Sequence, residues 1–293
     1  MKQKLLKILR SSYTAVTVIV VISVWMAVSY FGVSAGKELL FPGDSDTGGV
    51  TSYTQENADD CSVSGINLHG EIVTYHSPES YDEQGKLIAD ETSSDDVYWI
   101  LKSAEADDRI KAVLVEIDSS GGASAAGEEI MLALKHSKKP VTALIRRRGL
   151  SAAYMAATGA STIYASEMSD IGSIGTTMSY MEDAGKNRKD GLNFIDLSSG
   201  IYKESGNPDR PITVIEKRMF MRDVMLIHDI FVQAVVQNRQ LDINKVRKLA
   251  DGSSMLAVAA LENGLIDKIG GIYEVESFLE EQIGEAAQIC WQN

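Results

Sequence analysis

The sequence predicts an α/β fold with a largely parallel sheet, preceded by one transmembrane helix. From Gly65 onward, short runs rich in β-branched residues alternate with stretches of helical periodicity, which is typical of βαβ units. Turns rich in glycine and other small residues follow two of the expected strands, at the edge of the sheet where α/β proteins bind ligands. An apolar run near the N-terminus is long enough to cross a bilayer.

The apolar run covers Ala15 to Val33, which at 1.5 Å per residue can cross the roughly 30 Å hydrocarbon layer. Four basic residues between positions 2 and 10 precede it, so the positive-inside rule keeps the N-terminus in the cytoplasm and places the remainder outside. A cleaved signal peptide is the alternative, because Ser34 and Ala35 are small enough for a cleavage site. The length of the run favours an uncleaved anchor.

The residues that follow the anchor, beginning at Phe41, are polar and acidic and bury too little apolar surface to fold alone. We interpret them as a tether. The expected organisation is a cytoplasmic N-terminus at 1–12, the anchor at 13–34, a polar linker at 35–66, the folded domain at 67–284 and a C-terminal tail at 285–293.

Within the folded domain, the first expected elements are strands at 71–75, 111–117 and 140–145, with helices at 95–106 and 123–136. A short helix starts at Ser151 and a strand follows at 161–165. The remainder is helical, with a long helix from Pro211 to Gln240, a shorter one at 242–250 and a compact helix with glycine stops within 251–271. The mixed apolar pattern of the long helix indicates packing against the core or another subunit.

Two turns carry the candidate site. Ser119-Ser-Gly-Gly122 follows the strand at 111–117, and Ser151 falls at the turn between the strand at 140–145 and its helix. A helix that starts at such a turn points backbone N–H groups at the same spot, and glycines let a backbone approach a ligand closely. We therefore expect the two turns to form one site that stabilises a negatively charged oxygen.

Ser151 needs a partner that accepts its proton, because a serine hydroxyl attacks an amide too slowly unassisted. No motif marks any of the four histidines as an active-site base; they are His69, His76, His136 and His228. Lys203, about fifty residues downstream, is the candidate instead. A lysine accepts a proton only as the free amine, so its site must disfavour the ammonium form by burial.

Composition excludes some other functions. The formal net charge of −13 argues against a nucleic-acid binder. The run Arg146–Arg148 is the one basic cluster in the body of the chain, and we interpret it as a solvated strand end, with contact to a partner subunit or anionic lipid as the alternative. Cys61 and Cys290 are too few and too far apart for a usual zinc site, so we expect no metal and no cofactor. They could pair in an oxidising compartment.

Together these motifs resemble the signal peptide peptidases of the serine–lysine type, relatives of the Clp protease and crotonase fold. The matching segments, in order, are Ser119–Gly122, Leu150–Tyr154, Gly172–Gly175, the Lys203 segment at 199–213, and Asp251–Gly252 with 263–270. The resemblance covers roughly residues 68 to 275. It implies a Clp/crotonase-like fold of repeated ββα and βαβ units with a largely parallel sheet.

The resemblance also implies roles for individual residues. Ser151 would be the nucleophile, Lys203 the general base, and the N–H groups of Gly122 and Ala152 the oxyanion hole. Two serines are candidates to orient the lysine; they are Ser205 and Ser173.

Two departures from the family pattern keep alternatives open. Ser120 stands where the family commonly has proline, and Ala152-Ala153 stand where it commonly has two glycines, although an alanine keeps its N–H. An inactive relative that acts as a membrane scaffold or peptide-binding module is therefore one alternative. A crotonase-like acyl-CoA enzyme is the other, but it would need neither Lys203 nor the anchor.

Short members of this family look like rings or domes in which the serine of one subunit meets the lysine of its neighbour. The resemblance thus implies a homo-oligomeric, membrane-anchored serine endopeptidase that degrades remnant signal peptides or other unfolded peptides at the outer face of the membrane. Its expected partners are copies of itself, peptide substrates and the lipid around the N-terminal helix, with no nucleic acid.

Overall fold

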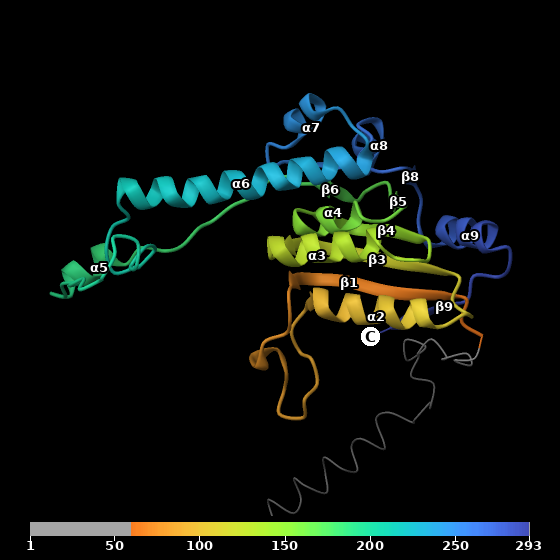
Figure 1. Cartoon of the computed structure of the whole chain (residues 1–293), viewed down its shortest axis with the longest axis horizontal. Coiled ribbons are helices and arrows are strands. Elements are labelled where there is room, and N and C mark those ends of the chain that lie inside the picture. The colour runs from red at the N-terminus through yellow and green to blue at the C-terminus, as the bar shows by residue number, and fades with distance from the viewer. Residues whose placement is uncertain (1–59, 293) are drawn as a thin grey trace, which may run out of the picture. The chain divides into compact units, whose positions relative to one another are not determined.

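The computed structural model describes residues 60–292 (Figure 1). The predicted anchor and most of the predicted linker lie outside the described residues. Among residues 60–292, no helix has both the length and the apolar character that crossing a bilayer requires.

A mostly parallel sheet organises the described residues. Its strands are β1 (Val63–Val73), β2 (Glu91–Ser93), β3 (Ala112–Gly122), β4 (Val141–Leu150), β5 (Thr162–Ala165), β6 (Asp170–Gly172), β7 (Ser254–Leu256), β8 (Lys268–Ile269) and β9 (Ile289–Gln292). The central order is β2-β1-β3-β4-β5-β8, with β9 beside β1, β6 beside β4 and β7 beside β6. Only the β6–β7 pairing is antiparallel among these strands. The predicted α/β fold with a largely parallel sheet is confirmed.

Helices lie against both faces of the sheet (Figure 1). They are α2 (Ser94–Ala106), α3 (Ser124–Lys135), α4 (Ala152–Ala157), α5 (Ala184–Lys189), α6 (Val214–Arg239), α7 (Ile243–Leu249), α8 (Ala257–Glu262), α9 (Ile272–Ile283) and a 3-10 turn, η1 (Pro78–Ser80). The larger core joins the sheet to α2, α3, α4 and the end of α6, and a smaller core on alternate strand residues lies under α9. The strands β1, β3, β4 and β5 thus carry buried residues on both faces of the sheet.

The sheet extends further at both ends than the sequence predicts. β1 begins at Val63, within the predicted linker, and β9 makes part of the predicted C-terminal tail a strand that pairs with β1. A disulfide between Cys61 and Cys290 joins the two ends, with the Cα atoms 5.7 Å apart. The chain around 61 and the chain around 290 therefore form one edge of the domain.

The region 251–271 differs from the predicted compact helix. It contains β7, the short helix α8 and β8. The strands β7 and β8 are three and two residues long, too short to show the alternation that identifies a strand in sequence.

The three consecutive arginines lie within β4 and face acidic partners on β3. Arg146 bonds Glu116 at 2.6 Å, and Arg147 bonds Asp118 at 3.1 Å. Arg146 and Arg147 remain largely exposed, which agrees with a solvated end of the strand.

Candidate active site

Ser151 occupies the turn between β4 and α4. Its backbone has φ 52° and ψ −125°, in a region that residues other than glycine rarely adopt. Its N–H donates to the carbonyl of Gly172 at 2.8 Å, which ties the turn to the end of β6. Its side chain does not cap α4, and no hydrogen bond to its hydroxyl is present among residues 60–292. The turn therefore presents an unengaged hydroxyl beside a helix N-terminus.

The glycine turn at the end of β3 lies directly against the Ser151 turn. Gly121 has φ +106°, and a Cβ added there would lie 2.8 Å from the Cβ of Ser151 and 3.1 Å from the nitrogen of Ala152. A side chain would not fit between the two turns. The two turns thus lie together, as the sequence predicts.

Two backbone N–H groups of these turns are candidates to stabilise a negatively charged oxygen. Ile72 of β1 accepts a hydrogen bond from Ala123 at 2.8 Å. Because bonding alternates along a parallel ladder, the N–H of Gly122 points away from β1, to the side on which β4 lies. Ala152 is the first residue of α4, where an N–H has no acceptor within the helix.

Ser119 holds the glycine turn in place. Its fully buried hydroxyl donates to the carbonyl of Gly70 at 2.6 Å and accepts from the N–H of Gly121 at 3.1 Å. Ser120 is exposed. The support of the turn therefore comes from Ser119 and does not depend on a proline at 120.

The alanines after Ser151 are accommodated by α3. Ala152 and Ala153 are both buried, and a Cβ added to Gly127 would lie 2.9 Å from the Cβ of Ala152. Gly127 thus makes room for the methyl group of Ala152. The departure from two glycines leaves the backbone of the turn intact.

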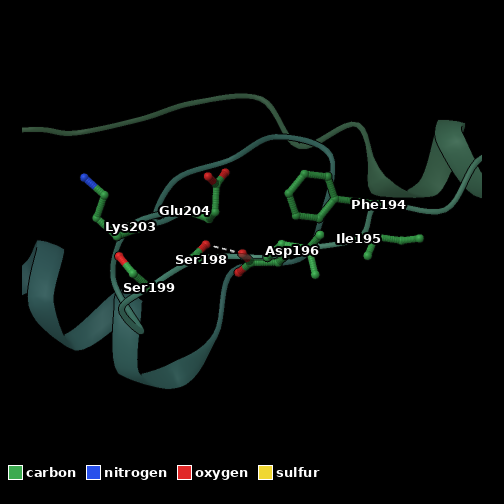
Figure 2. A pocket seen from close by; sticks show the side chains of 8 residues that line it. Phe194, Ile195, Asp196, Ser198, Ser199, Lys203 and Glu204 are labelled. Carbon is green, nitrogen blue, oxygen red and sulfur yellow. Dashed lines mark hydrogen bonds between the residues drawn. The ribbon is translucent and has the colours of Figure 1, made fainter.

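Lys203 lies in the loop between α5 and α6 and is exposed; its N–H donates to the carbonyl of Gly200 at 3.0 Å. The loop surrounds a cavity of about 350 Å³. Its lining residues are Phe194, Ile195, Asp196, Leu197, Ser198, Ser199, Lys203 and Glu204. Figure 2 shows the Lys203 amine at the end of the cavity opposite Phe194 and Ile195, pointing away from them.

Within one chain, the structure does not bring Lys203 to Ser151. No hydrogen bond joins them, and only the end of α6 contributes apolar residues to the core, namely Phe231, Val232 and Val235. From Val214 to Phe231 the helix rises roughly 25 Å at 1.5 Å per residue. Figure 1 accordingly shows α5 and the loop before α6 at the far end of α6 from α4.

The two candidate lysine-orienting serines belong to different ends of this arrangement. Ser173 follows Gly172, whose carbonyl binds the Ser151 N–H, and its hydroxyl donates to the carbonyl of Gly252 at 3.1 Å. Ser205 lies in the Lys203 loop, and its buried hydroxyl has no hydrogen-bond partner in the described part of the chain. Ser173 is thus held next to Ser151, whereas Ser205 belongs to the loop that carries Lys203.

Glu216 is a buried residue near Lys203 that the family motifs do not single out. Its one signal in the sequence is the spacing Thr213-x-x-Glu216, the pattern of a capping box that starts a helix. In the structure both halves of that capping box are present at the start of α6.

Residues 133–284 match the sequence profile of Peptidase family S49. A proposed protease of Methanocaldococcus jannaschii is 35% identical over 191 residues, which cover 64% of this chain and 61% of that protein. A proposed signal peptide peptidase of Enterococcus faecium is 31% identical over 198 residues, covering 66% of this chain and 58% of its own. The chain thus spans about three fifths of the length of these relatives.

Among solved structures, a mutant form of ClpP1 from Listeria monocytogenes is similar, with a TM-score of 0.46 and 13% sequence identity. The similarity covers 72% of this chain and 92% of that one.

Proposed function

This chain belongs to Peptidase family S49, and from that premise we propose that it is a membrane-anchored serine endopeptidase with Ser151 as nucleophile and Lys203 as general base. The observation that carries the proposal is the unengaged Ser151 hydroxyl at the N-terminus of α4, against the glycine turn of β3. A strained turn that exposes a serine beside free backbone N–H groups suits acyl transfer.

The reaction proceeds in two stages. The Oγ of Ser151 attacks the carbonyl carbon of the peptide bond while the neutral amine of Lys203 takes the hydroxyl proton. The N–H groups of Gly122 and Ala152 stabilise the resulting oxyanion. The C–N bond breaks as the leaving amine receives the proton from Lys203, and water, activated by the same lysine, hydrolyses the Ser151 ester.

The dyad forms between neighbouring copies of the chain. This is supported by the distance along α6 between the Lys203 loop and the core. It is also supported by the apolar residues that the first two thirds of α6 expose, which are Val214, Ile215, Met221, Met225, Leu226 and Ile230. Exposed apolar patches of this kind are typical of subunit contacts. A ring or dome would cover them and bury Lys203, which favours its neutral form.

Ser173 orients the incoming lysine. Its position beside Ser151 favours it over Ser205, because it is fixed at the nucleophile's end of the site before the lysine arrives. Ser205 is the less favoured candidate, because its buried hydroxyl has no hydrogen-bond partner in the described part of the chain.

The substrates are remnant signal peptides or other unfolded peptides, cleaved at the outer face of the membrane. The apolar run at 15–33 and the basic residues before it support an anchor with this orientation. The disulfide between Cys61 and Cys290 supports an oxidising compartment for the folded domain.

The experiment compares the assembled wild-type protein with its Ser151→Ala and Lys203→Ala variants on an unstructured peptide. Wild type is expected to cleave, and each variant to lose at least about 10³-fold in kcat, because removing a nucleophile or its base leaves only the oxyanion hole. Variants that cleave as fast as wild type would refute the dyad. An assembled wild type that binds the peptide without cleaving it would favour the scaffold.

A further inference from the structure

The carboxylate of Glu216, at the start of α6, is almost completely buried, with 2% of the residue exposed. It accepts hydrogen bonds from the N–H of Thr213 at 2.8 Å, the hydroxyl of Thr213 at 2.7 Å and the guanidinium of Arg210, whose Nη1 lies at 3.0 Å. A second guanidinium nitrogen of Arg210 also bonds this carboxylate. A capping box alone would use only the contacts with Thr213, so the pairing with Arg210 calls for a separate explanation.

Arg210 connects Glu216 to the lysine loop. Its Nη2 donates to the carbonyl of Glu204 at 2.8 Å, and Glu204 is the residue directly after Lys203. One planar guanidinium thus bonds a buried carboxylate and the backbone of the loop together. Lys in place of Arg210 could not make both contacts with the same geometry.

A second contact places the same loop on the next turn of α6. Gly206 has φ +79°, and a Cβ added to it would lie 3.3 Å from the Phe220 ring. Asn207 donates from Nδ2 to the carboxylate of Glu204 at 2.9 Å, which closes the loop on itself. The loop that carries Lys203 is therefore attached at several points to the first two turns of α6.

We propose that Glu216 is a positioning residue for the reaction: through Arg210 it holds the Glu204 carbonyl, and so sets the place and direction of the Lys203 amine. The inference rests on the proposed function, because it assigns Glu216 a role toward the lysine base. Glu216 touches neither substrate nor Ser151. It acts on Lys203 through Arg210 and the backbone of Glu204. Because Glu216 lies on α6, it also fixes the lysine relative to the helix that would contact the neighbouring copy.

The physical reason is that a base works only when it lies within hydrogen-bond reach of the hydroxyl. A displacement of about 1 Å can cost about 10²-fold in rate. The loop also carries two carboxylates beside Lys203, those of Asp196 and Glu204, which line the same cavity. In the assembled protein, a loop that moved would leave the lysine amine in water and beside these carboxylates, and both surroundings favour the ammonium form.

The test compares Glu216→Gln and Arg210→Lys with wild type, all as assembled full-length protein. Asp107→Asn is the matched control, because it removes a carboxylate from an ion pair with an arginine, Arg109, that lies outside α6 and the Lys203 loop. Steady-state kinetics on an unstructured peptide give kcat and KM across pH. Amide hydrogen exchange of residues 199–206 reports on the loop without depending on activity.

Glu216→Gln and Arg210→Lys are expected to lower kcat about 10-fold to 100-fold with KM changed less than about 2-fold. The pH of half-maximal activity on the acid side should rise, and amides 199–206 should exchange faster. Asp107→Asn should match wild type. A fall in kcat with no shift in that pH would indicate a purely structural role and overturn the proposal, as would wild-type kcat in both variants.

The proposed function and the role of Glu216 can be refuted independently of each other. If Ser151→Ala cleaved like wild type, the dyad would be refuted, whereas the role of Glu216 in holding the loop would still be decided by amide exchange. Unchanged exchange at 199–206 in Glu216→Gln would overturn the positioning role even if the dyad were established.

Discussion

At the scale of single residues, Gly121 is a position of the candidate site that has no room for a side chain. Its φ of +106° favours glycine, and an added Cβ would lie 2.8 Å from the Cβ of Ser151. The backbone strain and the steric clash of a side chain would both disturb the contact between the β3 turn and the Ser151 turn. The geometry of the proposed oxyanion hole therefore depends on the absence of a side chain at Gly121.

We expect Gly121→Ala to lower kcat by about 10²-fold, because the methyl group pushes the two turns apart and a displacement of about 1 Å at the reacting groups can cost that much in rate. Kinetics on an unstructured peptide measure it, with the thermal midpoint as a check on folding. Gly85→Ala is the control, since Gly85 has φ +77° but open space around it. Equal activity losses in the two variants would contradict this account.

The sequence identifies Ser151 and its turn because both signals are local: a β-branched run, then small residues that start a helix. It does not reveal that Lys203 lies far from Ser151 in the same chain. That separation depends on how much of α6 packs on the core, and the apolar pattern of α6 is equally compatible with core and subunit packing. Glu216 is missed because its partner Arg210 acts through a backbone carbonyl, which leaves no residue pattern.

At the scale of elements, most of the longer helices and strands are predicted, but β1 lies mostly before the strand expected at 71–75 and α9 is not predicted. The helices expected at 95–106 and 123–136 correspond to α2 and α3, within one or two residues. The strands β6 to β9 are not predicted, because two to four residues cannot establish a period of two. They matter to the site all the same, since β6 ends at the carbonyl that binds the Ser151 N–H.

The start of α6 should make stability depend on acid pH. Hydrogen bonds from Arg210 and then from Thr213 lower the pKa of Glu216 to about 2, from an ordinary value of 4.5. A carboxylate whose pKa is lower in the folded state stabilises the fold above its unfolded pKa. This stabilisation is present above about pH 4.5 and is lost as the pH falls toward 2.

We therefore expect the thermal midpoint of wild type to exceed that of Glu216→Gln at pH 7, with the difference shrinking below pH 4.5. Other lowered carboxyls, such as Asp107 beside Arg109, titrate in both proteins and cancel in the comparison. Calorimetric or circular-dichroism melts from pH 7 to pH 2.5 measure the difference, at about half-unit steps. A difference that stays constant across this range would show that the charge of Glu216 does not contribute.

At the scale of the whole molecule, the family predicted from the sequence is confirmed by the match to Peptidase family S49 and by the similarity to a relative named as a signal peptide peptidase. The domain boundaries of the sheet are not predicted at either end. Strand β9 pairs with β1 more than two hundred residues away in sequence, and a four-residue strand near a terminus looks like a tail. The disulfide between Cys61, just before β1, and Cys290 of β9 joins the two segments covalently beside this pairing.

The assembly of copies offers the sharpest test of where the dyad forms. Ser151→Ala keeps Lys203, and Lys203→Ala keeps Ser151, so each variant alone is expected to be inactive. In a ring mixed from equal amounts, about one site in four joins an intact serine to an intact lysine of the neighbouring copy. Unfolding and reassembling the two variants together should therefore restore about one quarter of wild-type kcat per subunit. If both groups came from one chain, no mixture would contain an intact dyad, and activity would stay at the level of the separate variants.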